Sequence, residues 1–503
     1  MGMTHSSIAH VLTTVSLFAC VSHASTSRQV DRTNAALRQL HNATSNQRSG
    51  QHLLNLSALR SLRDTDLRPF FSQFTQHPEW TVQVHAVLGL AELSEEQSID
   101  PWLVQQIAPT AREYVIAQAL DDGLIKKEQM QALLKWPPLE DAPKLLLLTD
   151  LRALSGDEGE VDAKMINDLA KSTDLAIAMF AALLSENQEN INRTTKYLRR
   201  ATSSNRDSAL IRTTQLIRQY NFESASPWLI SLLEDGSVAL TPKQRYWTLY
   251  TLLTVDSKSG LEIWNREIDV EPNRMDQVRY LMIVLEAGIT PTIAMRERLR
   301  IDLSDQLLGN LFMAGLLNGL KDKATDEDIS SLTSLAQQGH RTSTDWAFRI
   351  AKEVLTEEQA LPFYETLSTI EERASERRKE VAIRAFTQLI EIAPTSAWAI
   401  LENTKDDSEQ QELLLLAMLP LADDDAIAQA TKLRRIGVNK ADVLTLLLIA
   451  RSSSPLQKKD QEYLGIIAAG GGHLGPALET QAAWLYLKRM GLADKALAAV
   501  STQ

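Results

Sequence analysis

The sequence contains a single cysteine, Cys20, among its 503 residues. Cys20 lies in an N-terminal segment that we expect to be removed, which leaves a mature chain without disulfides, thiolate zinc sites or cysteine nucleophiles. Glycine is scarce too, at 20 residues or about 4%, below the usual ~7%. Strand-like alternation of apolar and polar residues is hard to find, so the composition predicts an all-α protein.

Long apolar runs are also missing after the first 24 residues. Dense runs such as Leu413–Leu419 are far shorter than the ~18 apolar residues that a membrane-spanning helix needs. We therefore expect no transmembrane helix in the mature chain. Acidic residues outnumber basic ones by 64 to 52, and the net charge of −12 argues against nucleic-acid binding.

The first 24 residues resemble a secretory signal peptide. They contain no Asp, Glu, Lys or Arg, carry an apolar stretch from Ile8 to Val21, and end in Ser22-His23-Ala24. Small residues at these positions predict cleavage between Ala24 and Ser25, although a basic n-region is missing. An uncleaved apolar helix retained in the cytosol is the alternative. Export predicts a periplasmic or secreted location.

Two lipid modifications compete with simple cleavage. Leu17-Phe18-Ala19-Cys20 resembles a bacterial lipobox, although Phe is unusual at its second position. Acylation of Cys20 would make the protein a lipoprotein. Met1-Gly2 with Ser6 fits a myristoylation pattern, but the apolar run directly behind it favours a signal peptide.

A helix-opening phrase recurs along the chain. Asp100-Pro101-Trp102-Leu103-Val104 returns as Ser226-Pro227-Trp228-Leu229-Ile230, with looser forms at Arg68–Phe71 and Leu361–Tyr364. Pro69 and Pro101 are 32 residues apart. The gap from Pro101 to Pro227 equals four steps of about 31.5 residues, and the gap from Pro227 to Pro362 equals four steps of about 33.75 residues. A fixed step of this size is typical of stacked helical pairs, which cannot bury their apolar faces alone.

Helix starts are marked by a capping side chain followed by proline, which has no N–H to leave unsatisfied. These dipeptides are Asp100-Pro101, Ser226-Pro227, Thr241-Pro242, Thr290-Pro291 and Ser454-Pro455. Together with the apolar spacing they predict a right-handed α-α superhelix, or solenoid, of about fourteen antiparallel helix pairs.

Two segments carry a resemblance to known repeat families. His77-Pro78-Glu79-Trp80 and the apolar residues that follow it, to Ile107, resemble a HEAT repeat; Ala483–Gly491 with Ala496-Leu497 resembles a tetratricopeptide repeat. Both families consist of antiparallel helix pairs. We therefore predict a signal peptide at 1–24, a polar N-terminal segment at 25–49, a HEAT-like array at 50–469 and a tetratricopeptide-like capping pair at 470–503.

Large aromatic residues recur near multiples of the same step. They are Phe70, Trp102, Trp228, Trp264, Phe363 and Trp398. We expect them to form a ladder in the core between repeats, because buried apolar bulk holds each unit to the next. An exposed stripe that grips a sugar or a peptide is the alternative.

The sequence predicts no catalytic, cofactor-binding or metal-binding residue. Gly470–Gly475 matches G-x-G-x-x-G, but a dinucleotide site needs flanking strands, so we interpret it as a flexible joint. The acidic clusters Asp157–Glu160 and Asp423–Asp425 do not follow the ligand order of a calcium loop. The histidines after the signal lack ligand spacing, and we expect them at the surface or in turns.

One basic cluster stands out from the acidic background. The segment between Ile191 and Tyr220 contains seven basic residues and a single acidic residue, Asp207. We predict that six of them contact an anionic partner, such as an acidic polysaccharide, a lipid headgroup or an acidic protein surface. They are Arg193, Lys196, Arg199, Arg200, Arg212 and Arg218.

These observations favour an exported, non-enzymatic solenoid scaffold that binds a protein partner along its concave face. One alternative is a glycan-binding or glycan-processing accessory of the cell envelope. It would be similar to the superhelical arm of lytic transglycosylases, without their catalytic domain. A lipid-tethered assembly factor is another, and it depends on acylation of Cys20.

Mass spectrometry of the mature N-terminus tests the export prediction. We expect a chain that starts at Ser25, because small residues precede that bond. An acylated chain that starts at Cys20 would identify the lipoprotein alternative. A chain that retains Met1 would contradict export.

Overall fold

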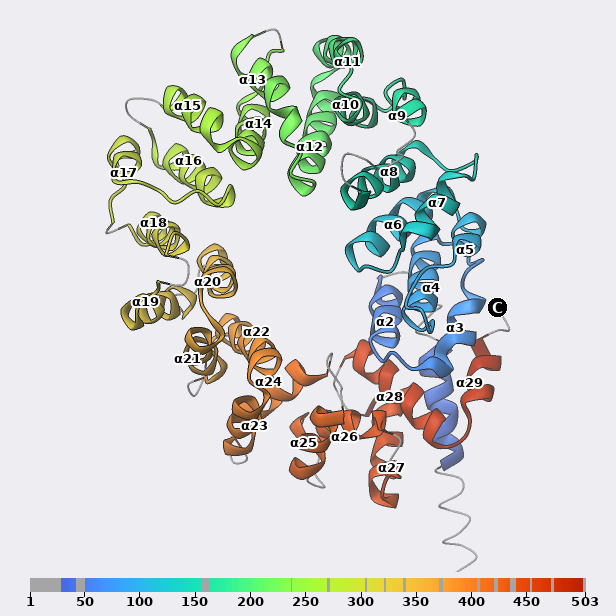
Figure 1. Ribbon diagram of the computed structural model, residues 1–503. Helices are drawn as coiled ribbons and strands as arrows, with labels where there is room; N and C mark the ends of the chain where they lie inside the picture. The colour runs from blue at the N-terminus through green and yellow to red at the C-terminus, as the bar shows by residue number, and fades with distance from the viewer. Residues whose placement is uncertain are drawn as a thin grey trace, which may run out of the picture. The chain divides into compact units, whose positions relative to one another are not determined.

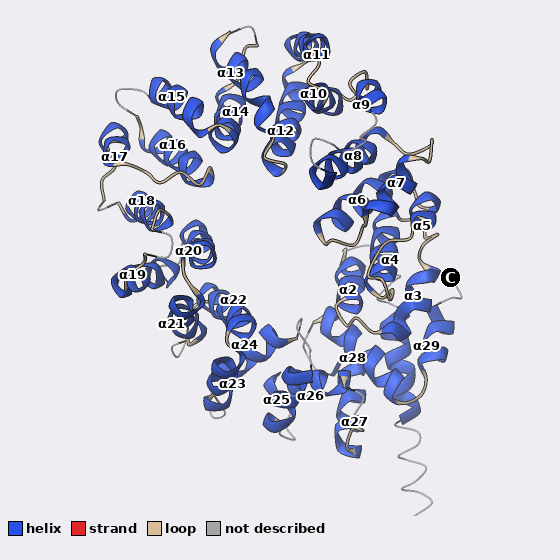
Figure 2. Ribbon diagram, viewed as in Figure 1, coloured by secondary structure: helices blue, strands red, loops and turns tan. Residues whose placement is uncertain are grey.

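The computed structural model describes most of the chain after residue 28. The described ranges are 29–41, 50–155, 163–236, 238–268, 272–303, 305–320, 323–337, 341–370, 374–404, 408–419, 424–434, 440–452, 455–471 and 475–500. Helix makes up 79% of the structure, and these ranges contain no strand (Figure 2). The predicted all-α class is confirmed. Cys20, Ala24 and Ser25 lie outside the described residues.

The chain divides into two compact units. Unit 1 joins the two ends of the chain, Met1–Val115 and Trp398–Gln503, and unit 2 is Ile116–Ala397. The boundaries fall within α6 (Pro109–Asp121) and α23 (Pro394–Asn403). Each unit is built from helices that pack on near neighbours in the sequence, with one exception in unit 1.

Unit 2 consists of two layers of helices (Figure 1). Its even layer holds α8 (Asp141–Ser155), α10 (Leu175–Leu184), α12 (Ser203–Gln219), α14 (Pro242–Val255), α16 (Arg274–Glu286), α18 (Gln306–Asn318), α20 (Arg341–Val354) and α22 (Glu376–Ile392). From α8 to α20, each of these helices packs on the next. Successive pairs thus bury their apolar faces against each other, as a helical repeat requires.

The odd layer of unit 2 alternates with the even layer along the chain. It holds α7 (Lys127–Leu134), α9 (Ala163–Leu169), α11 (Gln188–Arg200), α13 (Ser226–Glu234), α15 (Ser257–Glu267), α17 (Ile293–Leu299), α19 (Asp326–Gln337) and α21 (Glu357–Ser368). Most contacts of this layer are with the even layer: α13 and α15, for example, both pack on α14.

The predicted helix starts are confirmed at two dipeptides. The Asp100 carboxylate accepts a hydrogen bond from the Trp102 N–H at 2.8 Å and caps α5 (Pro101–Gln106). Thr241 caps α14 in a reciprocal capping box with Gln244. Each of these caps satisfies backbone N–H groups that have no partner inside the helix.

At two other dipeptides the predicted cap is wrong, although a helix does begin at Ser226, and the fifth is only partly described. The turn Glu223–Ala225 runs directly into α13, so Ser226 already has helical backbone and does not cap. α17 begins after Thr292 rather than Thr290, because the Thr292 hydroxyl accepts from the Met295 N–H. Ser454 lies outside the described residues, and the next helix begins at Lys458.

The predicted aromatic ladder is confirmed in part. Phe70, Trp228, Trp264 and Phe363 are buried, whereas Trp398 is half-buried and Trp102 is 61% exposed. The indole of Trp228 donates to the Thr195 hydroxyl at 3.1 Å, which fixes it against α11. Trp102 lies in the first turn of a six-residue helix that buries only Val104, so no neighbouring helix covers its ring.

Unit 1 brings its two chain segments together. The N-terminal segment holds the helix of residues 29–41, α2 (Gln51–Arg60), α3 (Arg68–Gln73), α4 (Trp80–Glu92) and α5. The C-terminal segment holds α24 (Ser408–Met418), α25 (Asp424–Leu433), α26 (Lys440–Arg451), α27 (Lys458–Ile466), the π turn Ile467–Gly471, α28 (Pro476–Arg489) and α29 (Ala493–Val500). Gly470 has a φ of 84°, so the backbone kinks within this turn, and no strand of a dinucleotide site precedes it in the described part of this segment.

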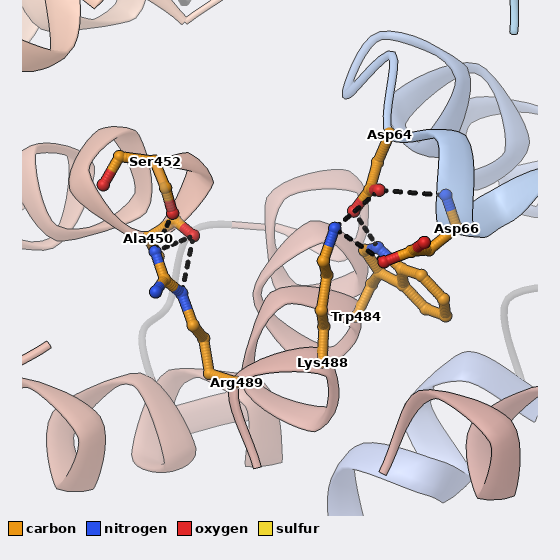
Figure 3. Close-up of polar contacts among 7 residues, drawn as sticks. All are labelled: Asp64, Asp66, Ala450, Ser452, Trp484, Lys488 and Arg489. Carbon is orange, nitrogen blue, oxygen red and sulfur yellow. Dashed lines mark hydrogen bonds and ion pairs between the residues drawn. The ribbon is translucent and has the colours of Figure 1, made fainter. Parts of the chain in front are cut away.

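The exception to near-neighbour packing is the contact of α28 with α2, with α29 against α3 nearby. The Trp484 indole donates to Asp64 at 2.8 Å across 420 residues of sequence. The Lys488 ammonium pairs with Asp64 at 2.7 Å and with Asp66 at 2.9 Å (Figure 3). Gln481 donates to the Ala58 carbonyl oxygen at 2.7 Å. We call this contact the terminal junction.

α28 is held from its own chain segment as well. The guanidinium of Arg489 donates to the carbonyl oxygens of Ala450 and Ser452 at the end of α26 (Figure 3). Arg451, the last residue of α26, donates to the side-chain oxygen of Gln481 at 3.2 Å. α28 therefore packs against both α26 and α2.

A tryptophan-to-alanine pair tests the terminal junction. Trp484 is fully buried, so Trp484→Ala leaves a cavity and takes the indole N–H from Asp64; we expect a loss of about 3–5 kcal/mol. Trp102→Ala removes an exposed ring and is expected to change stability by less than about 0.5 kcal/mol. Thermal unfolding followed by circular dichroism compares the two variants. Equal shifts in their midpoints would contradict the burial of α28 against α2.

Candidate functional site

The six predicted contact residues have different environments. The Arg193 guanidinium donates to the Ala170 carbonyl oxygen at 3.0 Å and to the Asn190 side chain at 2.9 Å. The Arg212 guanidinium lies 3.6 Å from the Asp174 carboxylate. Both side chains therefore stabilise contacts between helices of unit 2.

Lys196, Arg199 and Arg200 are exposed at the end of α11. Arg199 and Arg200 lie in the last turn of α11, where cations interact favourably with the helix dipole, so their position has a structural explanation. Tyr197 lies among them and is 53% exposed. These three cations remain accessible to an anionic partner, and the predicted contact role stays a prediction for them.

A pocket of about 330 Å³ lies beside Arg212, at the start of α10. Asp174 and Arg212 line it together with Thr173, Asn205 and Ser208. The Asp174 carboxylate already accepts from the N–H groups of Ala176 and Ile177 and faces Arg212. The hydrogen-bond donors and the positive charge that an anion would need in this pocket already interact with the Asp174 carboxylate.

Arg218, the last predicted contact residue, belongs to a different arrangement. Its guanidinium carbon lies 4.5 Å from the ring centre of Tyr250 and 5.3 Å from that of Trp247. The guanidinium also donates to the Thr251 hydroxyl. Arg218 lies in the last turn of α12 and the aromatic rings belong to α14, so a cation–π contact joins neighbouring helices of the even layer.

The aromatic residues of α14 form a continuous cluster. The rings of Tyr246 and Trp247 are 5.5 Å apart, and those of Trp247 and Tyr250 are 6.0 Å apart. Positions 246 and 250 are one helical turn apart and share a face. All three side chains are half-buried, which leaves part of each ring in contact with solvent.

The cluster continues with Glu286 at the end of α16. Its carboxylate lies 3.9 Å from the Arg349 guanidinium of α20. Arg349 also lies 4.9 Å from the ring centre of Trp346. We call Arg218, Tyr246, Trp247, Tyr250, Glu286 and Arg349 the aromatic–arginine strip.

Burial changes the ionisation of the strip. It raises the pKa of Tyr246 to about 12, with a further contribution from the Glu286 charge, and it raises the pKa of Tyr250. Burial also raises the pKa of Glu286, while Arg349 and Arg218 oppose the change. At neutral pH the phenols are therefore uncharged, and the strip offers flat rings, hydroxyl groups and guanidinium N–H groups. These groups can bind a ligand by stacking and hydrogen bonding.

Sequence reasoning identified only Arg218 of this strip, and for its charge alone. The signal that could have revealed the rest is Tyr246-Trp247 followed by Tyr250, in a helix whose start at Thr241-Pro242 was predicted. The sequence spacing between these aromatic residues and the core aromatic residues is not a multiple of the repeat step. An aromatic group that does not share the core position is a candidate for a surface.

The histidines of unit 1 correct a second prediction. His52 is 2% exposed, and its ring nitrogen lies 2.9 Å from the Glu79 carboxylate. His85 lies 3.3 Å from the guanidinium of Arg60, which pairs with Glu92. Burial, aided by the charges of Arg60 and His52, lowers the pKa of His85 to about 4. These histidines join α2 to α4: His52 is buried and His85 is half-buried, so neither is a fully exposed surface residue.

No known protein family, curated protein or solved structure matches the chain. In the described ranges, no group of three or more His, Cys, Asp or Glu residues could hold a metal ion. Over the same ranges, no helix is long and apolar enough to cross a membrane.

The depressed pKa of His85 predicts a loss of stability in mild acid. An unfolded histidine has a pKa near 6.5, so between pH 6.5 and 4 the unfolded state binds more protons than the folded state. The contribution of His85 is complete above about pH 6.5 and is lost towards pH 4; it amounts to about 2–3 kcal/mol. His85→Gln removes this titration.

Thermal midpoints between pH 7.5 and 5 test this prediction. We expect the midpoint of the natural protein to fall more steeply with decreasing pH than that of His85→Gln. The control replaces another histidine of unit 1 in the same way, as His77→Gln. Parallel curves for the natural protein and His85→Gln would show that His85 is not protonated on unfolding.

Proposed function

We propose that the protein is an exported, non-enzymatic scaffold of the cell envelope that binds another protein through the aromatic–arginine strip of unit 2. The observation that carries this proposal is the half-exposed cluster of Trp, Tyr and Arg side chains on α12, α14 and α20, together with Glu286 of α16. These three residue types are enriched where protein interfaces concentrate their binding energy.

The strip is suited to binding because its side chains are already ordered. Arg218 is fixed by two rings and by Thr251, and Arg349 by Glu286 and by the ring of Trp346. A ligand therefore immobilises few free rotamers when it binds. The rings still have uncovered apolar surface, whose removal from water favours association.

We further propose that the array is a right-handed superhelix of about fourteen HEAT-like or tetratricopeptide-like pairs, with the even layer on its concave face. The alternation of even and odd layers in unit 2 supports this proposal. Repeat arrays commonly use a concave surface for extended ligands. Export rests on the resemblance of residues 1–24 to a signal peptide.

A glycan-binding role is the second candidate, and one observation in unit 1 favours it. The rings of Trp80 on α4 and Tyr114 on α6 stack 4.8 Å apart at an interplanar angle of 29°, and Tyr114 is 54% exposed. Flat, exposed rings of this kind can pack against a sugar as well as against a peptide.

Site-specific photocrosslinking in cells tests the proposed function. A photoreactive amino acid at Tyr250 should give a reproducible adduct with one envelope protein. The same residue at Arg266, an exposed position of α15 in the odd layer, should not. The adduct identifies the partner for a direct binding measurement.

Binding of that purified partner then supplies the quantitative test. Trp247→Ala should weaken it at least tenfold, a typical loss for a hot-spot aromatic residue. Trp102→Ala, which removes an exposed ring in unit 1, should leave the affinity unchanged. Unchanged affinity of Trp247→Ala would contradict binding at the strip. Binding of envelope glycans that depends on Trp80 and Tyr114 would favour the second candidate.

A further inference from the structure

Most arginines that join the helices of unit 2 have a carboxylate partner. These pairs are Arg152–Glu186, Arg212–Asp174, Arg245–Glu267, Arg266–Glu234, Arg274–Asp305, Arg349–Glu286 and Arg384–Asp345. Arg206 is satisfied differently, because it donates to four backbone carbonyl oxygens, including those of Leu198 and Ala239. Either arrangement compensates the guanidinium for lost water.

In the described part of the chain, the Arg218 guanidinium has neither a carboxylate partner nor a set of backbone carbonyl acceptors. Among the described residues, no carboxylate oxygen lies within 4.0 Å of its guanidinium, and its single hydrogen bond goes to the Thr251 hydroxyl. Two aromatic rings provide its other contacts. A guanidinium has five N–H donors, so most of the donors of Arg218 have no partner among the described residues.

The unused donors of Arg218 are not sealed in the interior. No nitrogen of Arg218 is among the buried polar atoms that lack a hydrogen bond. The side chain is nevertheless half-buried, and this partial loss of water lowers the pKa of its guanidinium. The negative charge of Glu286 partly opposes this decrease in pKa, but the ion-pair partner of the Glu286 carboxylate is the Arg349 guanidinium, at 3.9 Å. A positive charge thus faces solvent from a partly dehydrated setting without an ion-pair partner.

We propose that Arg218 anchors the partner protein by binding the carboxylate of an Asp or Glu side chain. The proposal rests on the proposed function, because it assumes that the strip binds a protein. The rings of Tyr250 and Trp247 hold the guanidinium in place, and its free edge can donate two parallel hydrogen bonds to one carboxylate. Partial dehydration strengthens that bond relative to a fully exposed pair.

A protein carboxylate fits the surroundings of Arg218 better than an acidic glycan or a lipid headgroup. The aromatic neighbours pack against one another at steep angles, 83° for Tyr246 with Trp247 and 49° for Trp247 with Tyr250. No shared flat platform for a sugar ring results. The mixture of Tyr, Trp and one unpaired Arg is instead the composition of a protein-binding hot spot.

Peptide selection on the immobilised full-length chain tests the proposal. Random twelve-residue peptides are displayed on phage, and enriched peptides are synthesised for affinity measurements. We expect an Asp or Glu in the enriched peptides, and at least a tenfold loss of affinity when it is replaced by Asn or Gln. Arg218→Lys should cause a similar loss, because an ammonium cannot reproduce the bidentate bond. Arg266→Gln, outside the strip, is the matched control.

A double-mutant cycle isolates the contact itself. In the Arg218→Gln protein, replacement of the peptide acid by its amide should have no further effect, because the two changes remove one interaction. Independent, multiplicative effects would overturn the assignment of Arg218. Arg218→Lys keeps the charge and the aliphatic stem, so it provides the test even where Arg218→Gln does not fold.

The outcomes separate this proposal from the proposed function. Peptides that lose affinity with Trp247→Ala but need no acid would overturn the carboxylate assignment and leave the strip as a protein-binding site. Peptides that bind independently of Trp247 would contradict the proposed function. Binding of oligogalacturonate that depends on Arg218, without any such peptide, would replace the protein carboxylate by an acidic glycan.

Discussion

No helix pair of this chain can bury its apolar face alone, and the rest of the structure follows from that constraint. Inside an array each pair is covered by the pairs before and after it, but the first and last pairs lack one neighbour. In unit 1 this deficit is met by packing α2 against α28, around the fully buried Trp484. The indole N–H, the Lys488 ammonium and the Gln481 amide satisfy polar groups along the edge of the contact. The burial provides the stability, while the polar groups fix the register of the two helices.

The repeat step seen in the sequence reappears in the polar contacts. Arg152 donates to the Leu184 carbonyl oxygen and Arg451 to that of Leu419, each across 32 residues, and Arg298 donates to Asn265 across 33. The last carbonyl groups of a helix have no partner inside it, and an arginine from a neighbouring repeat can satisfy them. Arg60–Glu92 and Trp228–Thr195 span 32 and 33 residues in the same way. The period therefore reflects polar satisfaction of helix ends as well as burial of the apolar faces.

The sequence could predict what local patterns determine. Helical composition, the repeat step and the burial of Phe70, Trp264 and Phe363 follow from spacing, because residues one step apart occupy equivalent places in the array. Trp102 breaks the pattern since α5 is too short to bring a neighbour over its ring. The burial of His52 and the half-burial of His85 depend on how α2 meets α4, which no local pattern specifies. The strip was missed for the same reason: whether Trp247 and Tyr250 are covered depends on helices two elements away in the chain.

Arg218 and its two rings show how one set of contacts can serve both folding and recognition. The cation–π contact joins α12 to α14, and Arg384 makes a similar contact with Phe348 between α22 and α20, at 4.3 Å from the ring centre. Arg384, however, also pairs with Asp345, whereas Arg218 forms no ion pair with any described residue. A contact through the face of a guanidinium leaves its edge free, so the same side chain can hold two helices together and still offer donors to a ligand. A surface of this kind needs little rearrangement to bind, because the packing that positions Arg218 is part of the repeat array itself.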